Sequence, residues 1–123
     1  MGTEKKILLA EDDNLLRKSV ALFLSGVGFK VTQAANGREA TYSVQNDWFD
    51  LIITDLNMPY SGGLELIQLV HNDLRQKTPV IVLTVSGIES VELDSLSIGA
   101  DDFITKPFSL SVLKARVDRV LYG

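Results

Sequence analysis

Acidic side chains follow two apolar runs of this sequence at the point where each run ends. Glu11 and Asp12 come directly after the run at 7–10, and Asp55 comes directly after the run at 51–54. Uninterrupted runs of this kind are typical of strands that are buried on both faces of a parallel sheet. Ligands of open α/β sheets bind outside the carboxyl ends of the strands, so we expect the three carboxylates to lie together at one edge.

Three carboxylates at one edge would need a compensating cation. Two charges about 5 Å apart repel by about 3 kcal/mol at an effective dielectric constant near 20. Oxygen donors suit a hard divalent ion, and Mg²⁺ keeps several waters that phosphoryl oxygens can replace. The sequence therefore predicts a weak Mg²⁺ site that is open to a phosphoryl group.

Further side chains complete the chemistry expected at this edge. Lys106 follows a short strand-like segment at 103–105, and Pro107 fixes the turn behind it as a candidate for a cis peptide bond. Thr84 ends the apolar run at 80–83 and offers a hydroxyl. A carboxylate nucleophile, Mg²⁺, an ammonium and a hydroxyl are together what aspartyl phosphorylation requires.

The segments that must position these side chains alternate between strand and helix patterns. We expect strands at 6–10, 29–34, 51–54, 80–83 and 103–105. We expect helices from a cap at Asn14 to Gly26, at 38–45, 64–74 and 89–98, and after a cap at Ser109. Strict alternation predicts an α/β fold, a doubly wound five-stranded parallel sheet of the flavodoxin-like (βα)5 type with strand order 2-1-3-4-5.

Length and charge restrict the class of protein further. A chain of 123 residues fits one domain over 1–123. The net charge of −4 and the dispersed basic residues argue against direct nucleic-acid contact. No apolar run approaches the roughly 20 residues of a membrane span, the N-terminus lacks a signal-peptide core, and there are no cysteines. We expect a cytoplasmic protein without membrane contact.

The ordered set of motifs resembles the receiver domains of bacterial two-component response regulators, whose fold is that of the chemotaxis regulators. The resemblance covers nearly the whole chain. It rests on ILLAEDD at 7–13, DLNMP at 55–59, GLEL at 63–66, Thr84, and GADDFITKPF at 99–108. The motifs are individually common, but their order at matching strand ends is highly specific.

The resemblance implies a role for each residue at the expected edge. Asp55 would be the phosphoacceptor and Asp12 a direct Mg²⁺ ligand. Asp55 would also bind the ion, Glu11 would assist through water, and the backbone carbonyl of Asn57 would complete the protein ligands.

The resemblance also implies a switch and a phosphoryl donor. Lys106 and Thr84 would bind the phosphoryl group, while Thr84 and Phe103 would form a switch pair that shifts the surface of the fourth helix, fifth strand and fifth helix. The donor would be a phosphohistidine on a sensor histidine kinase or phosphotransfer protein. Such a domain is no turnover enzyme, although it catalyses its own phosphorylation and dephosphorylation.

One departure from the family pattern leads to a prediction. Val85 follows Thr84 where the family usually carries a small residue. A branched side chain there should narrow access to Asp55, so we expect slow phosphorylation and slow dephosphorylation.

Other functions fit the sequence less well. An FMN binder of the same fold would need a Ser/Thr/Gly-rich phosphate loop where Glu11 and Asp12 stand. A haloacid-dehalogenase-type phosphatase needs a second aspartate where Asn57 stands. A degenerate receiver that serves only as an interaction module would not need the intact set of Asp12, Asp55, Thr84 and Lys106.

The output of the switch is less clearly indicated. Segments 99–103 and 113–121 resemble receivers attached to winged-helix DNA-binding domains, which tend to dimerise through the fourth helix, fifth strand and fifth helix when phosphorylated. Asp101, Asp102, Arg116 and Arg119 are candidates for salt bridges in such a homodimer. A stand-alone regulator and the receiver of a hybrid kinase stay open as alternatives, as do the cognate kinase and the pathway.

Overall fold

The computed structural model describes residues 4–85 and 99–123 of the chain. Its elements are β1 (Lys6–Ala10), α1 (Asn14–Gly26), β2 (Lys30–Ala34), α2 (Gly37–Asn46), β3 (Leu51–Asp55), α3 (Gly63–Gln68), the π-helix η1 (Leu69–Asp73), β4 (Val80–Val85), β5 (Asp102–Lys106) and α5 (Leu110–Tyr122). The helix expected at 89–98 lies outside the described residues.

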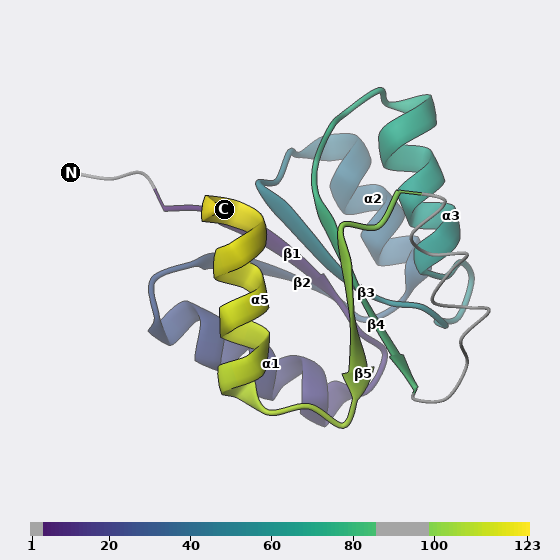
Figure 1. The fold of residues 1–123 in the computed structure, drawn as a ribbon. Helices are drawn as coiled ribbons and strands as arrows, with labels where there is room; N and C mark the ends of the chain where they lie inside the picture. The colour runs from purple at the N-terminus through teal and green to yellow at the C-terminus, as the bar shows by residue number, and fades with distance from the viewer. Residues whose placement is uncertain (1–3, 86–98) are drawn as a thin grey trace.

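All strands run parallel in one sheet of order β2-β1-β3-β4-β5, which confirms the predicted architecture (Figure 1). The register aligns the carboxyl ends of neighbouring strands. Asp55 pairs with Leu83 and Val85 pairs with Lys106. The residues at these strand ends therefore meet along one edge.

Helices cover the sheet on both faces, with α1 and α5 on one side and α2 and α3 on the other (Figure 1). Alternate residues of each central strand point to opposite layers. In β1, Ile7 and Leu9 join the α1/α5 core, while Leu8 and Ala10 join the α2/α3 core. Both faces of these strands are buried, which is the reason for their uninterrupted apolar runs.

The start of α1 differs by one residue from the expectation. The cap is Asp13 rather than Asn14, because Asp13 has extended backbone and its carboxylate accepts the Leu16 N–H at 3.1 Å. Asp13 is therefore engaged in helix capping.

The helix expected at 64–74 is not uniform. It is α-helical only to Gln68 and continues as η1, where the Leu74 N–H donates to the Leu69 carbonyl. The wider turn keeps Val70 fully buried while the His71 Nε2 lies 2.7 Å from the Thr78 carbonyl oxygen. Within the described ranges, no helix has the length and apolar character needed to cross a membrane.

Candidate functional site

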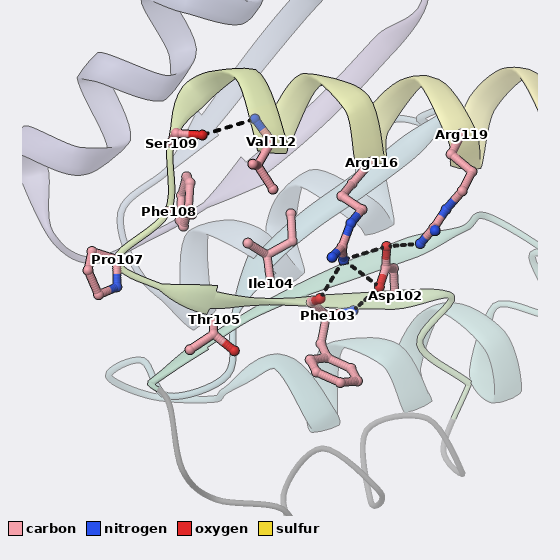
Figure 2. A pocket seen from close by; sticks show the side chains of 10 residues that line it. All are labelled: Asp102, Phe103, Ile104, Thr105, Pro107, Phe108, Ser109, Val112, Arg116 and Arg119. Atoms are coloured by element: carbon pink, nitrogen blue, oxygen red, sulfur yellow. Dashed lines mark hydrogen bonds and ion pairs between the residues drawn. The ribbon is translucent and has the colours of Figure 1, made fainter.

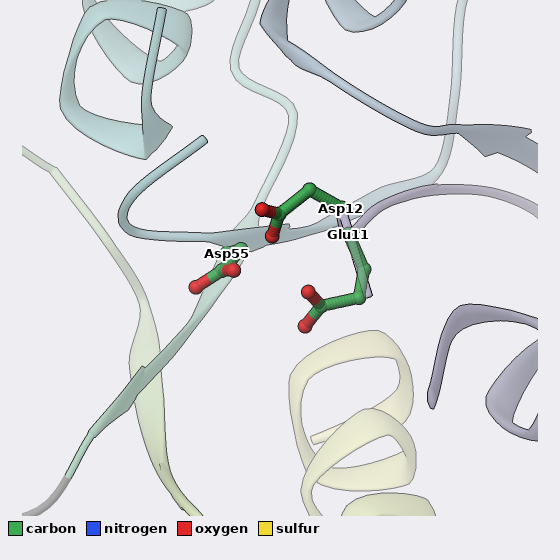
Figure 3. Close-up of side chains that lie close together, drawn as sticks. All are labelled: Glu11, Asp12 and Asp55. Atoms are coloured by element: carbon green, nitrogen blue, oxygen red, sulfur yellow. The ribbon is translucent and has the colours of Figure 1, made fainter. Parts of the chain in front are cut away.

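Three carboxylates converge at the carboxyl ends of β1 and β3 (Figure 3). One oxygen from each of Glu11, Asp12 and Asp55 lies within 4.8 Å of the others. Glu11 is 1% exposed and Asp55 is 9% exposed, whereas Asp12 is open to solvent. The cluster is thus anchored in the protein on one side and reachable from outside on the other.

Lys106, the last residue of β5, brings the opposite charge. Its Nζ lies 2.6 Å from Glu11 Oε1 and 3.2 Å from Asp55 Oδ2. The peptide bond between Lys106 and Pro107 is cis. Two of the three carboxylates contact this ammonium, and within the described residues no second cation is paired with the cluster, so its three carboxylates outnumber the cation by two.

Burial, together with the neighbouring negative charge, changes the acidity of Asp55. Burial, followed by the charge of Glu11, raises the pKa of Asp55 from 3.8 to about 7, although Lys106 opposes this rise. The pKa of Lys106 is also raised: burial by itself lowers it, but the contacts with Glu11 and Asp55 outweigh that effect. Without a further cation, the carboxyl of Asp55 therefore takes up a proton near neutral pH.

Glu11 is held in place from three directions. Its Oε2 accepts the Asp13 N–H at 3.0 Å, and its own N–H donates to the Ala34 carbonyl at 3.0 Å. Its carbonyl accepts from Arg17 Nη1 at 3.0 Å. Arg17 is a buried supporting residue that sequence reasoning missed. The available signal was its position on the apolar face of α1 with Val20.

The cluster fits a hard divalent ion. All of its donor atoms are carboxylate oxygens, and two of its charges are uncompensated. In the described part of the chain, buried Glu11 Oε1 has Lys106 as its charge partner but no hydrogen bond. Asn57, expected to add a backbone carbonyl, is exposed two residues after Asp55.

Thr84 lies buried near the end of β4. Its hydrogen bond is a long one, 3.4 Å, to the carbonyl of Val85. Val85 is 62% exposed and stands in register with Lys106. The structure thus places Thr84 at the expected edge of the sheet.

Phe103 and Asp102 lie on β5, and Arg116 and Arg119 lie on α5. Figure 2 shows Ile104 pointing toward α5 and Phe103 pointing to the other face of β5. Phe103 is half-buried against the α2/α3 core. A cavity of about 550 Å³ lies along β5 and the start of α5.

The acids and arginines expected to bridge two copies are engaged within this chain. Arg116 Nη1 lies 3.1 Å from both carboxylate oxygens of Asp102, and Arg119 Nη2 lies 2.6 Å from Asp102 Oδ2 (Figure 2). Asp101 Oδ2 accepts the Val80 N–H at 2.9 Å. These contacts arise because β5 and α5 are adjacent, so Asp102 meets the arginines of its own α5.

Comparison with known proteins agrees with the geometry. A doubly wound sheet with an acidic cluster and a lysine at its carboxyl edge defines a receiver, the phosphoacceptor switch of two-component systems. The family model for the response regulator receiver domain matches residues 7–118. This chain belongs to the response regulator receiver family.

Individual relatives show receivers in several contexts. The chain is 39% identical over 116 residues to the transcriptional regulatory protein CrdR of Helicobacter pylori, covering 94% of this chain and 54% of CrdR. Chemotaxis response regulator CheY4 of Vibrio cholerae is 34% identical with a TM-score of 0.90, covering 97% of this chain and all of that one. The receiver domain of a signal transduction histidine kinase from Syntrophus aciditrophicus is 37% identical with a TM-score of 0.85, covering 97% and 91%. The chain spans about half the length of CrdR and similar transcriptional regulators.

Proposed function

We propose that Asp55 accepts a phosphoryl group from the phosphohistidine of a sensor histidine kinase or a phosphotransfer protein. The observation that carries this proposal is the convergence of Glu11, Asp12 and Asp55 with Lys106 at one edge of the sheet. Asp55 is the last residue of the central strand β3 and contacts Lys106, whereas the similarly buried Glu11 is held by Lys106 and the Asp13 N–H.

The reaction is a displacement at phosphorus. A carboxylate oxygen of ionised Asp55 attacks the phosphorus atom, an O–P bond forms, and the N–P bond of the phosphohistidine breaks with its electron pair moving to the imidazole nitrogen. Lys106 then pairs with a phosphoryl oxygen, exchanging its contact with Asp55 for one with the new group. Attack by water on the phosphorus reverses the modification and returns the carboxylate.

Asp12 and Asp55 would hold Mg²⁺ directly, with the Asn57 backbone carbonyl as a third protein ligand and Glu11 acting through water. When bound, the ion neutralises charge on the cluster and on the phosphoryl oxygens. Glu11 is suited to the indirect role, because it is buried and already engaged with Lys106 and the Asp13 N–H. The exposed carboxylate of Asp12 is suited to direct contact.

The phosphorylated state is read out through Thr84 and Phe103. The Thr84 hydroxyl leaves the Val85 carbonyl for a phosphoryl oxygen, and the half-buried Phe103 ring turns into the space that it vacates. This movement biases the surface of β5 and α5, together with the helix expected at 89–98, between two states. The receiver thereby controls an output partner or domain without direct nucleic-acid contact of its own.

The remaining parts of the proposal follow from this role. The chain acts as one receiver domain over residues 1–123 in the cytoplasm, away from the membrane. It turns over no separate substrate, and its catalysis is limited to its own phosphorylation and dephosphorylation.

Intact mass after incubation with acetyl phosphate and Mg²⁺ tests the proposal. We expect a gain of one phosphoryl group, about 80 Da by phosphate chemistry, that is lost with EDTA and in Asp55→Asn. Asp50→Asn is the matched control and keeps the gain, because Asp50 stands at the opposite end of the same strand, where it binds the Lys6 N–H. No gain, together with no binding of beryllofluoride in the presence of Mg²⁺, would contradict the proposal.

A further inference from the structure

The loop between β3 and α3, residues 56–62, is fastened to the start of α2. The Gly37 N–H donates to the Pro59 carbonyl at 3.0 Å. The guanidinium carbon of Arg38 lies 4.1 Å from the centre of the Tyr60 ring, within the range of a cation–π contact. These contacts lie outside the acidic cluster, and the chemistry described above does not use them.

Tyr60 adopts a backbone conformation that an aromatic residue rarely takes. Its φ is +77°, in the left-handed region, which costs free energy for any residue with a β-carbon. Its side chain is 69% exposed, so burial in the core does not hold it there. The Arg38 stacking and the Gly37–Pro59 hydrogen bond are contacts that keep the loop in this conformation.

The start of α2 approaches the loop as closely as glycine allows. A β-carbon at Gly37 would overlap the backbone carbonyl oxygen of Ser61. The corner itself is rigid, because Asn36 Oδ1 accepts the Glu39 N–H at 2.9 Å and Glu39 Oε1 accepts the Ala35 N–H at 2.7 Å. A rigid corner in such close contact can fix the position of the loop.

The same corner also holds the segment after β1. The Ala34 carbonyl accepts the Glu11 N–H at 3.0 Å. Residues 34–38 therefore join the two segments that supply the candidate ion ligands, one with Glu11 and Asp12 and the other with Asn57. This corner is a second connection between the two segments, in addition to the direct pairing of β1 with β3.

We propose that Arg38 and Tyr60 are positioning residues for the divalent ion and the phosphoryl group. Their stacking fixes the loop at 56–62, and with it the backbone of Asn57, relative to the acids that follow β1. The inference rests on the proposed function, since it concerns the ligands of that same site. The roles of the two residues are indirect, because neither lies among the acids.

Titration with Mg²⁺ alone, followed by the backbone amide NMR shifts of Asp12 and Asn57, tests the inference. In Arg38→Gln and in Tyr60→Gly we expect the apparent Kd for Mg²⁺ to rise about two- to fivefold, as loss of a surface cation–π contact implies. The double variant should match the single ones, since both changes break the same link. Thermal unfolding without Mg²⁺ should change little in Tyr60→Gly, where glycine relieves the left-handed strain.

Arg75→Gly is the matched control. Arg75 is exposed and also has a left-handed backbone, with φ of +55°, but it lies before β4 at the opposite end of the sheet. Its replacement should leave the Kd for Mg²⁺ unchanged.

Three results would overturn the inference, and they are distinguishable. If the wild type binds Mg²⁺ and is phosphorylated while both variants keep its Kd, Arg38 and Tyr60 have no positioning role and the proposed function stands. The positioning role is equally excluded if the variants lose only thermal stability. If the wild type neither binds Mg²⁺ nor gains a phosphoryl group, the proposed function and the inference both fail.

Discussion

The buried carboxyl of Asp55 makes the stability of the metal-free protein depend on pH. Burial and the nearby Glu11 raise the pKa of Asp55 to about 7, against 3.8 for an unperturbed aspartate. Between these values the folded state holds a proton that the unfolded chain has released. The free energy of unfolding therefore falls as pH rises from about 4 to about 7.

Asp55→Asn should remove this fall in the free energy of unfolding. Without Mg²⁺ we expect the variant to be more stable than the wild type above pH 7, by on the order of 2 kcal/mol, with the difference vanishing near pH 4. Urea unfolding across that pH range measures it. A difference that does not vary with pH would contradict the assigned cause.

Asp47→Asn serves as a control, because it should change the free energy of unfolding in the opposite direction. The hydrogen bond from Lys6, followed by that from the Trp48 N–H, lowers the pKa of the exposed Asp47. A lowered pKa contributes stability that is present above pH 4 and lost as pH falls through the folded-state value. This variant should therefore be slightly less stable than the wild type at neutral pH, and the difference should close in acid.

We expect Val85 to slow phosphorylation and dephosphorylation of Asp55. Its exposed side chain stands beside Lys106 in the sheet register. Val85→Ala should speed both phosphorylation by acetyl phosphate and hydrolysis of the product by about two- to tenfold, the effect of a steric barrier of up to about 1.4 kcal/mol. Val112→Ala, another exposed valine, is the control. An unchanged hydrolysis rate in Val85→Ala would contradict the expectation that the Val85 side chain narrows access to Asp55.

At the scale of elements, strand positions were predictable while helix boundaries were less so. Strands buried on both faces leave long apolar runs, and burial against two helix layers is a large, collective effect. A helix end depends on one or two hydrogen bonds, so the cap at Asp13 rather than Asn14 could not be chosen from residue type alone. The π-helical turn at η1 likewise left no signal in the residue types of 69–73.

Position 99 requires glycine, because of its backbone conformation and because His71 lies close to it. Gly99 has φ of +121°, and a β-carbon there would lie 2.9 Å from His71 Nδ1. Gly99→Ala should reduce the free energy of unfolding by about 1–3 kcal/mol. Gly26→Ala is the control, because Gly26 ends α1 in open space, and it should be neutral or slightly stabilising. Chemical denaturation of both variants measures the difference, and equal effects would contradict the account.

At the scale of the whole molecule, topology made the site predictable. Residues 11 and 12, residue 55 and residue 106 come from three distant parts of the sequence, yet they lie at or directly after strand ends that must meet once the strand order is known. Contacts set by side-chain rotamers were not predictable in this way. These include the Arg17 bond to the Glu11 carbonyl, the Arg38 stacking on Tyr60 and the direction of the Thr84 hydroxyl.

The surface of β5 and α5, together with the helix expected at 89–98, is where we expect phosphorylation to act on assembly. Arg119 is exposed on α5 and could exchange its Asp102 for that of a second copy. Sedimentation should show a monomer for the untreated protein and a homodimer with beryllofluoride and Mg²⁺. Asp55→Asn should stay monomeric under both conditions. If the treated wild type binds beryllofluoride and remains monomeric, the expected dimerisation is contradicted. The phosphoacceptor role of Asp55 would not be affected by that result.

Chemical trapping of the phosphorylated residue tests the central claim most directly. Borohydride reduces an aspartyl phosphate to the alcohol, so an acceptor aspartate becomes homoserine, which peptide mass mapping can locate. After treatment with acetyl phosphate and Mg²⁺, we expect homoserine at position 55 alone. Homoserine at position 12 or 13, or a phosphoryl group on a hydroxyl side chain with position 55 unchanged, would contradict the account.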